Sequence, residues 1–240
     1  MKVWTFWTGE ITKRIETCLA TIEKACTQSQ WQHLDMSAAE KVLDGKVDPV
    51  WRRLIPAHQA DVLRACVLAQ YGGLWVDADT VMFRDPVEYF GHLDKFAYTT
   101  WDNPPLRAIN GYVYSPRPNH PVALDWFSRV STSLSEMNHW DDAQIVGLER
   151  TNWTRFGEKC LTPALTEEGS IKYPRNVFLP LDLDLSSPKF FEDLDWTSFV
   201  KPATIGFGLS NSYIEVREHK IKPDTLICRL MEFAERYKER

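Results

Sequence analysis

Two aspartates spaced two residues apart, Asp77 and Asp79, are the residues of this chain best suited to chemistry. They follow an apolar run, 74–76, that is typical of a buried strand. Because side chains alternate along a strand, we expect both carboxylates to face the same side of a cleft. Mg²⁺ and Mn²⁺ accept a few carboxylates and take their other ligands from water or phosphate. The pair therefore indicates a divalent cation bound together with a diphosphate, although a solvated strand end is the commoner origin of an isolated Asp-x-Asp triplet.

A second polar pair, Asp61 and Arg64, lies on the element that must precede this strand. Residues 56–71 are predicted to form a helix, because Pro56 suits a first helical turn and Gly72 suits a helix end. Residues three apart share a helix face, so Asp61 and Arg64 can act on one ligand. The alternative is a surface ion pair, worth less than about 1 kcal/mol.

In three linked segments, Ala60–Arg64, Tyr71–Gly73 and Asp77–Asp79, the chain resembles the DXD-containing glycosyltransferase sugar-binding-region family. That family includes capsular polysaccharide enzymes and yeast-type mannosyltransferases, and the clostridial glucosylating toxins are more distantly similar. The close match covers residues 57–86, with weaker similarity over most of the chain. The resemblance implies a GT-A fold and a metal-dependent retaining transferase that moves a hexose from a UDP- or GDP-hexose, with Mn²⁺ or Mg²⁺ as cofactor.

The same resemblance implies roles for four side chains of this sequence. Asp61 is expected to bind hydroxyls of the donor sugar, and Arg64 the sugar and the diphosphate. Asp77 is expected to contact the ribose or sugar and to belong to the metal shell, and Asp79 to bind the metal directly. We therefore expect Asp77, Asp79 and Arg64 to be the catalytic residues.

The N-terminus independently predicts a nucleotide-binding unit. Residues 2–8 form an expected strand that ends at Gly9, and apolar residues then recur at helical spacing. These are Ile11, Ile15, Cys18, Leu19, Ile22, Ala25 and Cys26. In such a strand-turn-helix unit the ligand lies beyond the carboxyl end of the strand, where Trp7 stands. By its match to the family's first strand, Trp7 is expected to stack on the donor base, with core packing as the alternative.

Two further segments carry donor-binding candidates through the family resemblance. Asn110 matches an Asn-rich strand start that faces the donor sugar, although Asn110-Gly111 also suits a simple turn. Near the C-terminus, residues 208–213 align with a His-x-Trp-Asn-Ser pattern, in which Gly208 and Ser210 replace the His and the Trp. Ser212 is carried over as a donor-binding residue and Asn211 as a metal ligand, with a simple turn as the alternative.

The remaining pattern predicts an α/β chain with a mixed central sheet flanked by helices, a GT-A-like and Rossmann-related fold. Further strands are expected at 31–36, 96–101 and 111–115, and helices at 37–43 (with Ser37 as cap), 121–137 and 223–237. Residues 139–144 suit either a sugar-binding segment or a helix start capped by Asp141. We expect one domain over 1–240, with the donor half at about 1–115 and the acceptor side and C-terminal loop at about 116–240.

Composition restricts the class of partner. The chain has 240 residues and a formal net charge of −5, so a broad electrostatic grip on nucleic acid is disfavoured. The five cysteines show no zinc-binding spacing and are expected to be reduced core residues. No apolar run approaches the roughly 20 residues that cross a bilayer, and no signal peptide is recognisable. We expect a cytoplasmic protein, with the C-terminal helix resting on the inner face of the membrane as an alternative to simple packing.

The sequence thus predicts a transferase that acts on a glycan or lipid-linked glycan acceptor of capsule, lipopolysaccharide or similar type, with the acceptor pocket expected around residues 101–106 and 140–153. Two rivals share the same residues: a sugar-nucleotide hydrolase and a catalytically silent sugar-nucleotide-binding protein. No protein base is recognisable from any motif. If a covalent intermediate forms instead, its nucleophile would have to come from Asp102, Asp141 or Asp142, the carboxylates left for the opposite sugar face.

Overall fold

The protein was analysed as a computed structural model that describes residues 1–101, 107–181, 188–209, 214–215 and 217–239. Its centre is a six-stranded mixed sheet in the order β2-β1-β3-β6-β5-β7. The strands are β1 (Lys2–Phe6), β2 (Gln30–Leu34), β3 (Gly73–Val76), β5 (Phe96–Thr100), β6 (Ala108–Ser115) and β7 (Ser170–Lys172). β1 pairs in parallel with β2 and β3, and β6 is antiparallel to both β3 and β5. This confirms the predicted α/β mixed-sheet fold.

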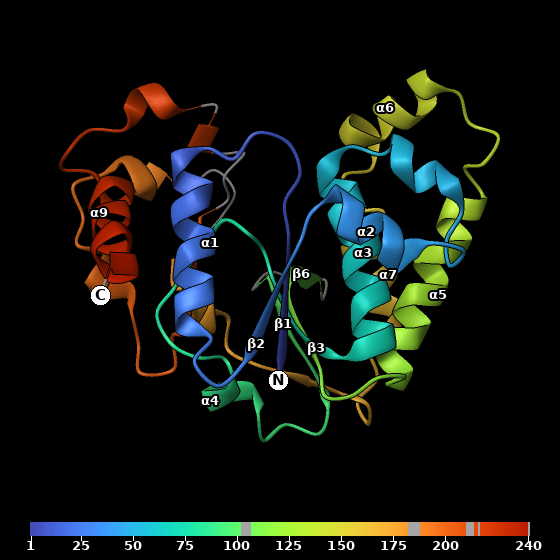
Figure 1. The fold of residues 1–240 in the computed structure, drawn as a ribbon, viewed down its shortest axis with the longest axis horizontal. Coiled ribbons are helices and arrows are strands. Elements are labelled where there is room, and N and C mark those ends of the chain that lie inside the picture. The colour runs from blue at the N-terminus through green and yellow to red at the C-terminus, as the bar shows by residue number, and fades with distance from the viewer. Residues whose placement is uncertain (102–106, 182–187, 210–213, 216, 240) are drawn as a thin grey trace.

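Helices cover both faces of the sheet, as Figure 1 shows. On one side lie α1 (Lys13–Ala25) and α9 (Leu226–Glu239), which pack against each other. On the other lie α2 (Met36–Leu43), α3 (Pro56–Tyr71), α5 (Pro121–Ser135) and α7 (Glu158–Leu161), with α6 (Asp142–Thr151) at one end. A second, two-stranded sheet is formed by β4 (Thr80–Met82) and β8 (Gly206–Gly208). The short α4 (Val87–Phe90) follows β4 along the chain. 3₁₀ turns occupy Pro49–Arg53, Thr162–Ala164, Arg175–Val177, Pro188–Phe191, Trp196–Phe199 and Glu218–Lys220.

The predicted helix over 56–71 is confirmed at both ends. Pro56 occupies its first turn, and Gly72 caps it with φ of 64°. Gly73 follows with φ of 97°, and a Cβ atom there would lie 2.4 Å from the carbonyl oxygen of Lys2. Only glycine combines this backbone conformation with so close an approach, and it allows the chain to turn directly from α3 into β3 beside β1.

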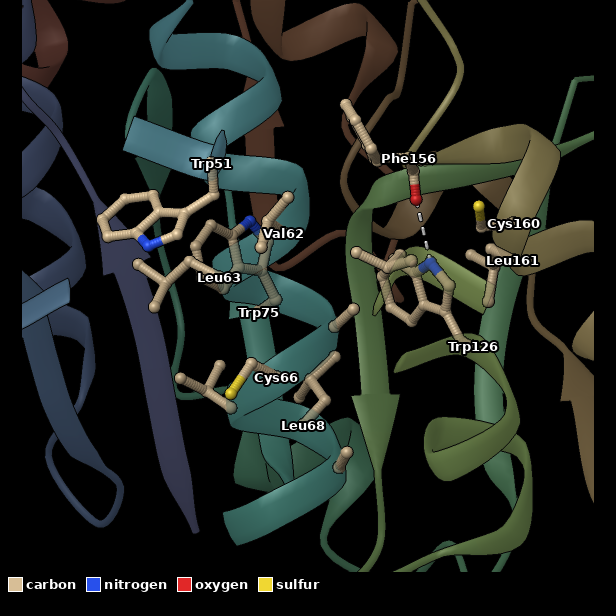
Figure 2. Close-up of a cluster of buried hydrophobic side chains, with 14 of the residues drawn as sticks. Trp51, Val62, Leu63, Cys66, Leu68, Trp75, Trp126, Phe156, Cys160 and Leu161 are labelled. Atoms are coloured by element: carbon tan, nitrogen blue, oxygen red, sulfur yellow. Dashed lines mark hydrogen bonds between the residues drawn. The ribbon is translucent and has the colours of Figure 1, made fainter. Parts of the chain in front are cut away.

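The helix α3 is buried on nearly every side, which accounts for its weak apolar periodicity. It packs between the sheet and α5, where Trp51, Leu63 and Trp75 form part of one apolar cluster (Figure 2). The same cluster reaches Trp126, whose indole N–H donates to the carbonyl oxygen of Phe156 at 3.1 Å. A helix so enclosed is a rigid support for any polar side chain that it carries.

Several predicted boundaries and caps are confirmed, and others are wrong. Asp141 caps α6 in a capping box, as one of the two alternatives for 139–144 proposes. Asp35 caps α2 and not Ser37, because the helix begins at Met36, two residues earlier than a cap at Ser37 would require. Ile11 precedes α1 and is 51% exposed, so it does not belong to the core stripe. On α5, Leu124 is exposed and Trp126 is buried in the core.

Among the described residues no helix is both long enough and apolar enough to cross a membrane. All five cysteines are free, and Cys18, Cys66 and Cys160 are buried, as expected of reduced core residues.

Candidate functional site

A cavity of about 400 Å³ opens at the edge of the sheet where β1 and β3 end. Parallel strands that end at one edge present their following residues to the same space. Six of the residues predicted from sequence line this cavity together: Trp7, Asp61, Arg64, Asp77, Asp79 and Asn110. They come from the residue after β1, from α3, from the turn after β3 and from β6, and more than one hundred positions of the chain separate Trp7 from Asn110.

Arg64 joins the two predicted motifs at the centre of the cavity wall. One terminal nitrogen, Nη1, donates to Asp61 Oδ1 at 3.0 Å, and the other, Nη2, donates to Asp77 Oδ1 at 2.6 Å. The guanidinium also lies over the Trp75 ring, 4.9 Å from its centroid. The Arg64 side chain is 5% exposed and that of Asp61 12%, so this is a buried bridge and not the surface ion pair considered as its alternative.

The environment of Asp61 keeps it close to its titration point at neutral pH. Burial raises the pKa of Asp61 to about 7, while the adjacent Arg64 charge lowers it and the Asp77 charge raises it. Asn110 Nδ2 donates to Asp61 Oδ1 at 2.6 Å, which favours the ionised form. Near this pH the carboxyl is present in both forms: the ionised form accepts a hydrogen bond from a sugar hydroxyl, and the protonated form can donate one to it.

Asp77 and Asp79 face one cavity, but strand alternation is not the reason. β3 ends at Val76, and both aspartates lie in the turn between β3 and β4. Thr80 Oγ1 donates to the Asp77 carbonyl at 2.7 Å, so Tyr112, 2.9 Å away, must donate its hydroxyl proton to Thr80. This chain of hydrogen bonds fixes the turn, which is what presents both carboxylates.

Asn110 lies within β6, so the alternative of a simple turn is wrong. The antiparallel register places Tyr112 opposite Val76, and Asp77 N donates to the Gly111 carbonyl at 3.2 Å. A Cβ atom at Gly111 would lie 2.2 Å from Asp77 Oδ2, and one at Gly157 would lie 2.2 Å from Asn110 Nδ2. Both glycines therefore leave the room that two site side chains occupy.

Gly208, the position at which a family histidine is replaced, lies in β8 against the same hydrogen-bonded turn. A Cβ atom here would lie 2.2 Å from the Tyr112 hydroxyl oxygen. No histidine fits in this arrangement without displacing Tyr112. The space that a side chain at position 208 would need is taken by Tyr112, which holds the turn carrying the aspartates.

Trp7 both lines the cavity and packs on a core. Its indole N–H donates to the Glu10 carbonyl at 3.1 Å, and its ring lies against the cluster of Ile15, Leu19 and Ala78. Trp7 is partly exposed, so a ligand in the cavity can contact it.

The carboxylates suit a cation that shares its shell with a ligand. Among the described residues, no group of three or more His, Cys, Asp or Glu side chains could hold a metal ion. Mg²⁺ in phosphate-binding sites ordinarily takes only one or two carboxylates and completes its shell with phosphate and water. Asp77 Oδ1 already accepts from Arg64 and from Trp75 Nε1, at 2.9 Å. Asp79 and the second oxygen of Asp77 thus form a donor set that fits such a shared ion.

Two predicted residues, Asn211 and Ser212, lie outside the described residues, as does Asp102. Asp141 and Asp142 do not line the cavity: Asp141 caps α6, and Asp142 pairs with Arg53 at 2.6 Å.

Several lining residues, among them His58, Thr154 and Glu215, were not predicted from sequence, whereas Trp153 ends the segment 140–153 that was expected to take part in the acceptor pocket. His58 carries a detectable signal, because it stands three residues before Asp61 on one helix face. Nothing in the local sequence of Thr154 or Glu215 connects them with the aspartates.

Comparison with known proteins gives a family and a fold. The model of a family described as capsular polysaccharide synthesis protein matches residues 2–127. The apo form of the glycosyltransferase GlyE of Streptococcus pneumoniae TIGR4 is 12% identical, with a TM-score of 0.51 over 100% of this chain. The match covers 60% of GlyE, so this chain spans about three fifths of its length. At this identity the likeness shows the fold alone, which is that of GT-A-like glycosyltransferases.

Two other solved structures resemble the chain at lower TM-scores. PaToxG glycosyltransferase is 15% identical, with a TM-score of 0.46, over 70% of this chain and 69% of its own. A glycosyltransferase involved in glycosylation of the major capsid of PBCV-1 is 13% identical, with a TM-score of 0.43, over 91% and 98% of the two chains. No curated protein sequence matches this chain.

Proposed function

Since the chain belongs to the capsular polysaccharide synthesis protein family and has a GT-A-like fold, we propose that it is a metal-dependent glycosyltransferase. It would move a hexose from a UDP- or GDP-hexose to a glycan or lipid-linked glycan, with retention of the α configuration. The observation that carries the proposal is the buried Arg64 bridge between Asp61 and Asp77, in one cavity with Asp79 and Trp7.

Each side chain has a part that follows from its position. Trp7 offers an aromatic face to the base at the end of β1. Asp61 and Asn110 present oxygen and amide groups for the hydroxyls of the hexose. Arg64 has both terminal nitrogens engaged, so its main contribution is to fix two carboxylates in place.

Asp79, with Asp77 and with Asn211 as a further candidate, would hold Mn²⁺ or Mg²⁺ against the diphosphate. When bound, such an ion stabilises the negative charge that builds on the leaving diphosphate. The protein's part is to hold the two carboxylates rigidly in advance, through Trp75, Arg64 and the turn at Thr80.

The stereochemical outcome depends on whether a protein base faces the acceptor. Asp61 and Asp77 are engaged with Arg64, and Asp79 is assigned to the ion. Glu215 is the other carboxylate among the described residues of the cavity. We propose that the departing phosphate takes the acceptor proton on the same sugar face, which keeps the α configuration.

Replacement of Asp79 by Ala tests the metal and the donor together. Metal-dependent binding of UDP or GDP, measured by isothermal titration calorimetry with Mn²⁺, should be lost, and transfer with it. Asp125→Ala removes an exposed aspartate that pairs with Arg129 on α5 and serves as control. Unchanged Mn²⁺-dependent affinity in Asp79→Ala would remove the metal from the proposal.

Proton NMR of the first product formed decides the remaining alternatives. An α-linked product is expected. A β-linked product whose formation stops in Glu215→Gln would show an inverting enzyme with Glu215 as base. Free sugar alone would favour the hydrolase, and binding without turnover would favour the silent binding protein.

A further inference from the structure

A second tryptophan, Trp153, lines the cavity together with Trp7. It lies in the segment between α6 and α7 and is 47% exposed. A singly exposed apolar residue is common on protein surfaces, so it is the place of Trp153 in the cavity lining that singles it out. Pro56, Ala57 and Thr154, which line the cavity from the start of α3 and from the segment of Trp153, carry no formal charge.

The backbone that carries Trp153 is fixed from several sides. His58 is buried, and its Nε2 lies 3.0 Å from the Trp153 carbonyl oxygen. Because a carbonyl only accepts, Nε2 carries the proton and donates it. The centroid of the imidazole lies 5.7 Å from that of the Trp153 ring and 5.5 Å from that of the Phe156 ring, which it meets in an edge-to-face arrangement. The buried Trp126 donates a hydrogen bond to the Phe156 carbonyl (Figure 2). The backbone from Trp153 to Phe156 is thus hydrogen-bonded at both ends, which restricts the position of the exposed Trp153 indole.

Position along α3 relates this indole to the other site residues. Arg64, Asp61 and Ala57 follow one another toward the start of the helix at spacings of three and four residues, and all three line the cavity. At about 1.5 Å per residue, Ala57 lies about 6 Å beyond Asp61 along the helix axis. If Asp61 faces the donor hexose, the space beside Ala57 and Trp153 lies next to that hexose, on the side away from Asp77.

We propose that Trp153 is the stacking platform for a neutral pyranose of the acceptor glycan. This inference rests on the proposed transferase function and adds the acceptor subsite to it. An indole face packs against the C–H face of a pyranose, while Thr154 offers a hydroxyl to its rim. The sugar so held presents a hydroxyl to the donor hexose at the distance that transfer needs. Its oxygen bonds to C1, the bond from C1 to the diphosphate oxygen breaks, and the hydroxyl proton leaves with the diphosphate.

The test compares the wild type with Trp153→Ala and Trp153→Phe. Val146→Ala, which shortens an exposed apolar side chain on α6, is the matched control. The probes are a panel of neutral methyl hexopyranosides, observed by saturation-transfer NMR with and without UDP or GDP and Mn²⁺. Transfer to the same pyranosides gives KM, and calorimetry gives the affinity for UDP or GDP.

In Trp153→Ala we expect the saturation transfer to a pyranoside to be lost and its KM to rise about tenfold, the scale of one aromatic contact. Affinity for the nucleoside diphosphate should stay within about twofold, since Trp7 and Asp79 are untouched. Trp153→Phe should keep part of the saturation transfer and show a smaller rise in KM, because it keeps an aromatic face. Val146→Ala should match the wild type.

Three results would overturn the subsite. The first is unchanged pyranoside binding and KM in Trp153→Ala, and the second is absence of pyranoside binding by the wild type under every condition. The third is a loss of nucleotide affinity in Trp153→Ala as large as the loss of pyranoside binding, which would place the indole on the donor. If the wild type binds pyranosides through Trp153 but no nucleoside diphosphate, the transferase proposal fails while the sugar subsite stands.

Discussion

At the scale of single residues, one buried arginine organises the site. Arg64 contacts Asp61, Asp77 and the Trp75 ring at once, and these groups come from a helix, a turn and a strand. The planar fork of a guanidinium can bridge two carboxylates in this way, and the point charge of lysine cannot. Arg64 is therefore both a functional and a structural residue.

Replacing Arg64 by Lys should lower both activity and stability. An ammonium carries its donors on one nitrogen and cannot reproduce the two separate nitrogens that reach Asp61 and Asp77, so at least one of these hydrogen bonds is lost or lengthened. The free energy of unfolding should fall by about 1–3 kcal/mol, measured by urea denaturation, and transfer should fall steeply. Arg129→Lys, in an exposed pair, should be nearly neutral. Unchanged stability with lost activity would mean that Arg64 acts on the donor alone.

The raised pKa of Asp61 predicts that the free energy of unfolding depends on pH. That pKa is about 7 in the folded protein, against an ordinary value of 3.8, and burial is the main cause. Between pH 4 and 7 the folded state holds a proton that the unfolded chain has released, so the free energy of unfolding falls as pH rises and levels off above 7. The upper limit of this loss is about 4 kcal/mol.

Asp61→Asn should remove that part of the pH dependence. The amide has no proton to release, while its oxygen still accepts from Arg64 and Asn110. Urea unfolding at pH 5 and at pH 7.5 would compare the two proteins. An identical pH dependence in both would show that Asp61 stays ionised in the folded state.

At the scale of elements, the antiparallel β6 is what brings Asn110 and Gly111 to the aspartates. Its start lies beside the end of β3, so Asn110 reaches Asp61 and Gly111 passes directly beneath the Asp77 carboxylate. The close approach requires a residue without a side chain. Gly157, before α7, plays the same part against Asn110.

Gly111→Ala should damage the site from a position with no chemistry of its own. The new methyl group would need the space of Asp77 Oδ2, so the carboxylate must shift away from Arg64 and Trp75. We expect at least a tenfold loss of metal-dependent nucleotide affinity by calorimetry, since one charged group moves. Gly147→Ala on α6, where nothing lies within 4 Å of the new Cβ atom, is the control. Normal affinity in Gly111→Ala would contradict the proposed role of Asp77.

At the scale of the whole molecule, the cavity is shared by the elements of both helical layers. Trp7 rests on α1 residues on one side of the sheet, and Asp61 with Arg64 belongs to α3 on the other. A ligand that fills the cavity therefore contacts both layers and should stabilise the folded chain as a unit by mass action.

Mn²⁺ and a nucleoside diphosphate should raise the melting temperature synergistically. Since the described carboxylates suit a shared ion and not a closed cage, Mn²⁺ alone should have little effect. With UDP or GDP at about 100 times Kd, stabilisation should reach about 2.7 kcal/mol. Thermal-shift measurements with each component alone and together decide this, and purely additive shifts would indicate separate binding sites.

Local sequence determined much of this protein. Pro56 and the glycines at 72 and 73 set the ends of α3, because proline and left-handed backbone are constraints that act within a few residues. Spacing on that helix placed Asp61 beside Arg64, and the apolar run before Asp77 placed the aspartates at the end of a strand. The mixed α/β fold and the pairs Asp61–Arg64 and Asp77–Asp79 could be predicted in this way, and the family resemblance added Trp7 and Asn110.

Only the tertiary structure decided how these parts meet. The strand expected to carry Asp77 and Asp79 ends before them, and a hydrogen-bonded turn anchored by Tyr112 and Thr80 orients them instead. The register of β6, the glycines that make room at 111 and 157, and the exposed indole of Trp153 leave no local pattern. The reason is that close approach and burial are properties of pairs of segments far apart in the chain, and neither segment's sequence records the position of the other.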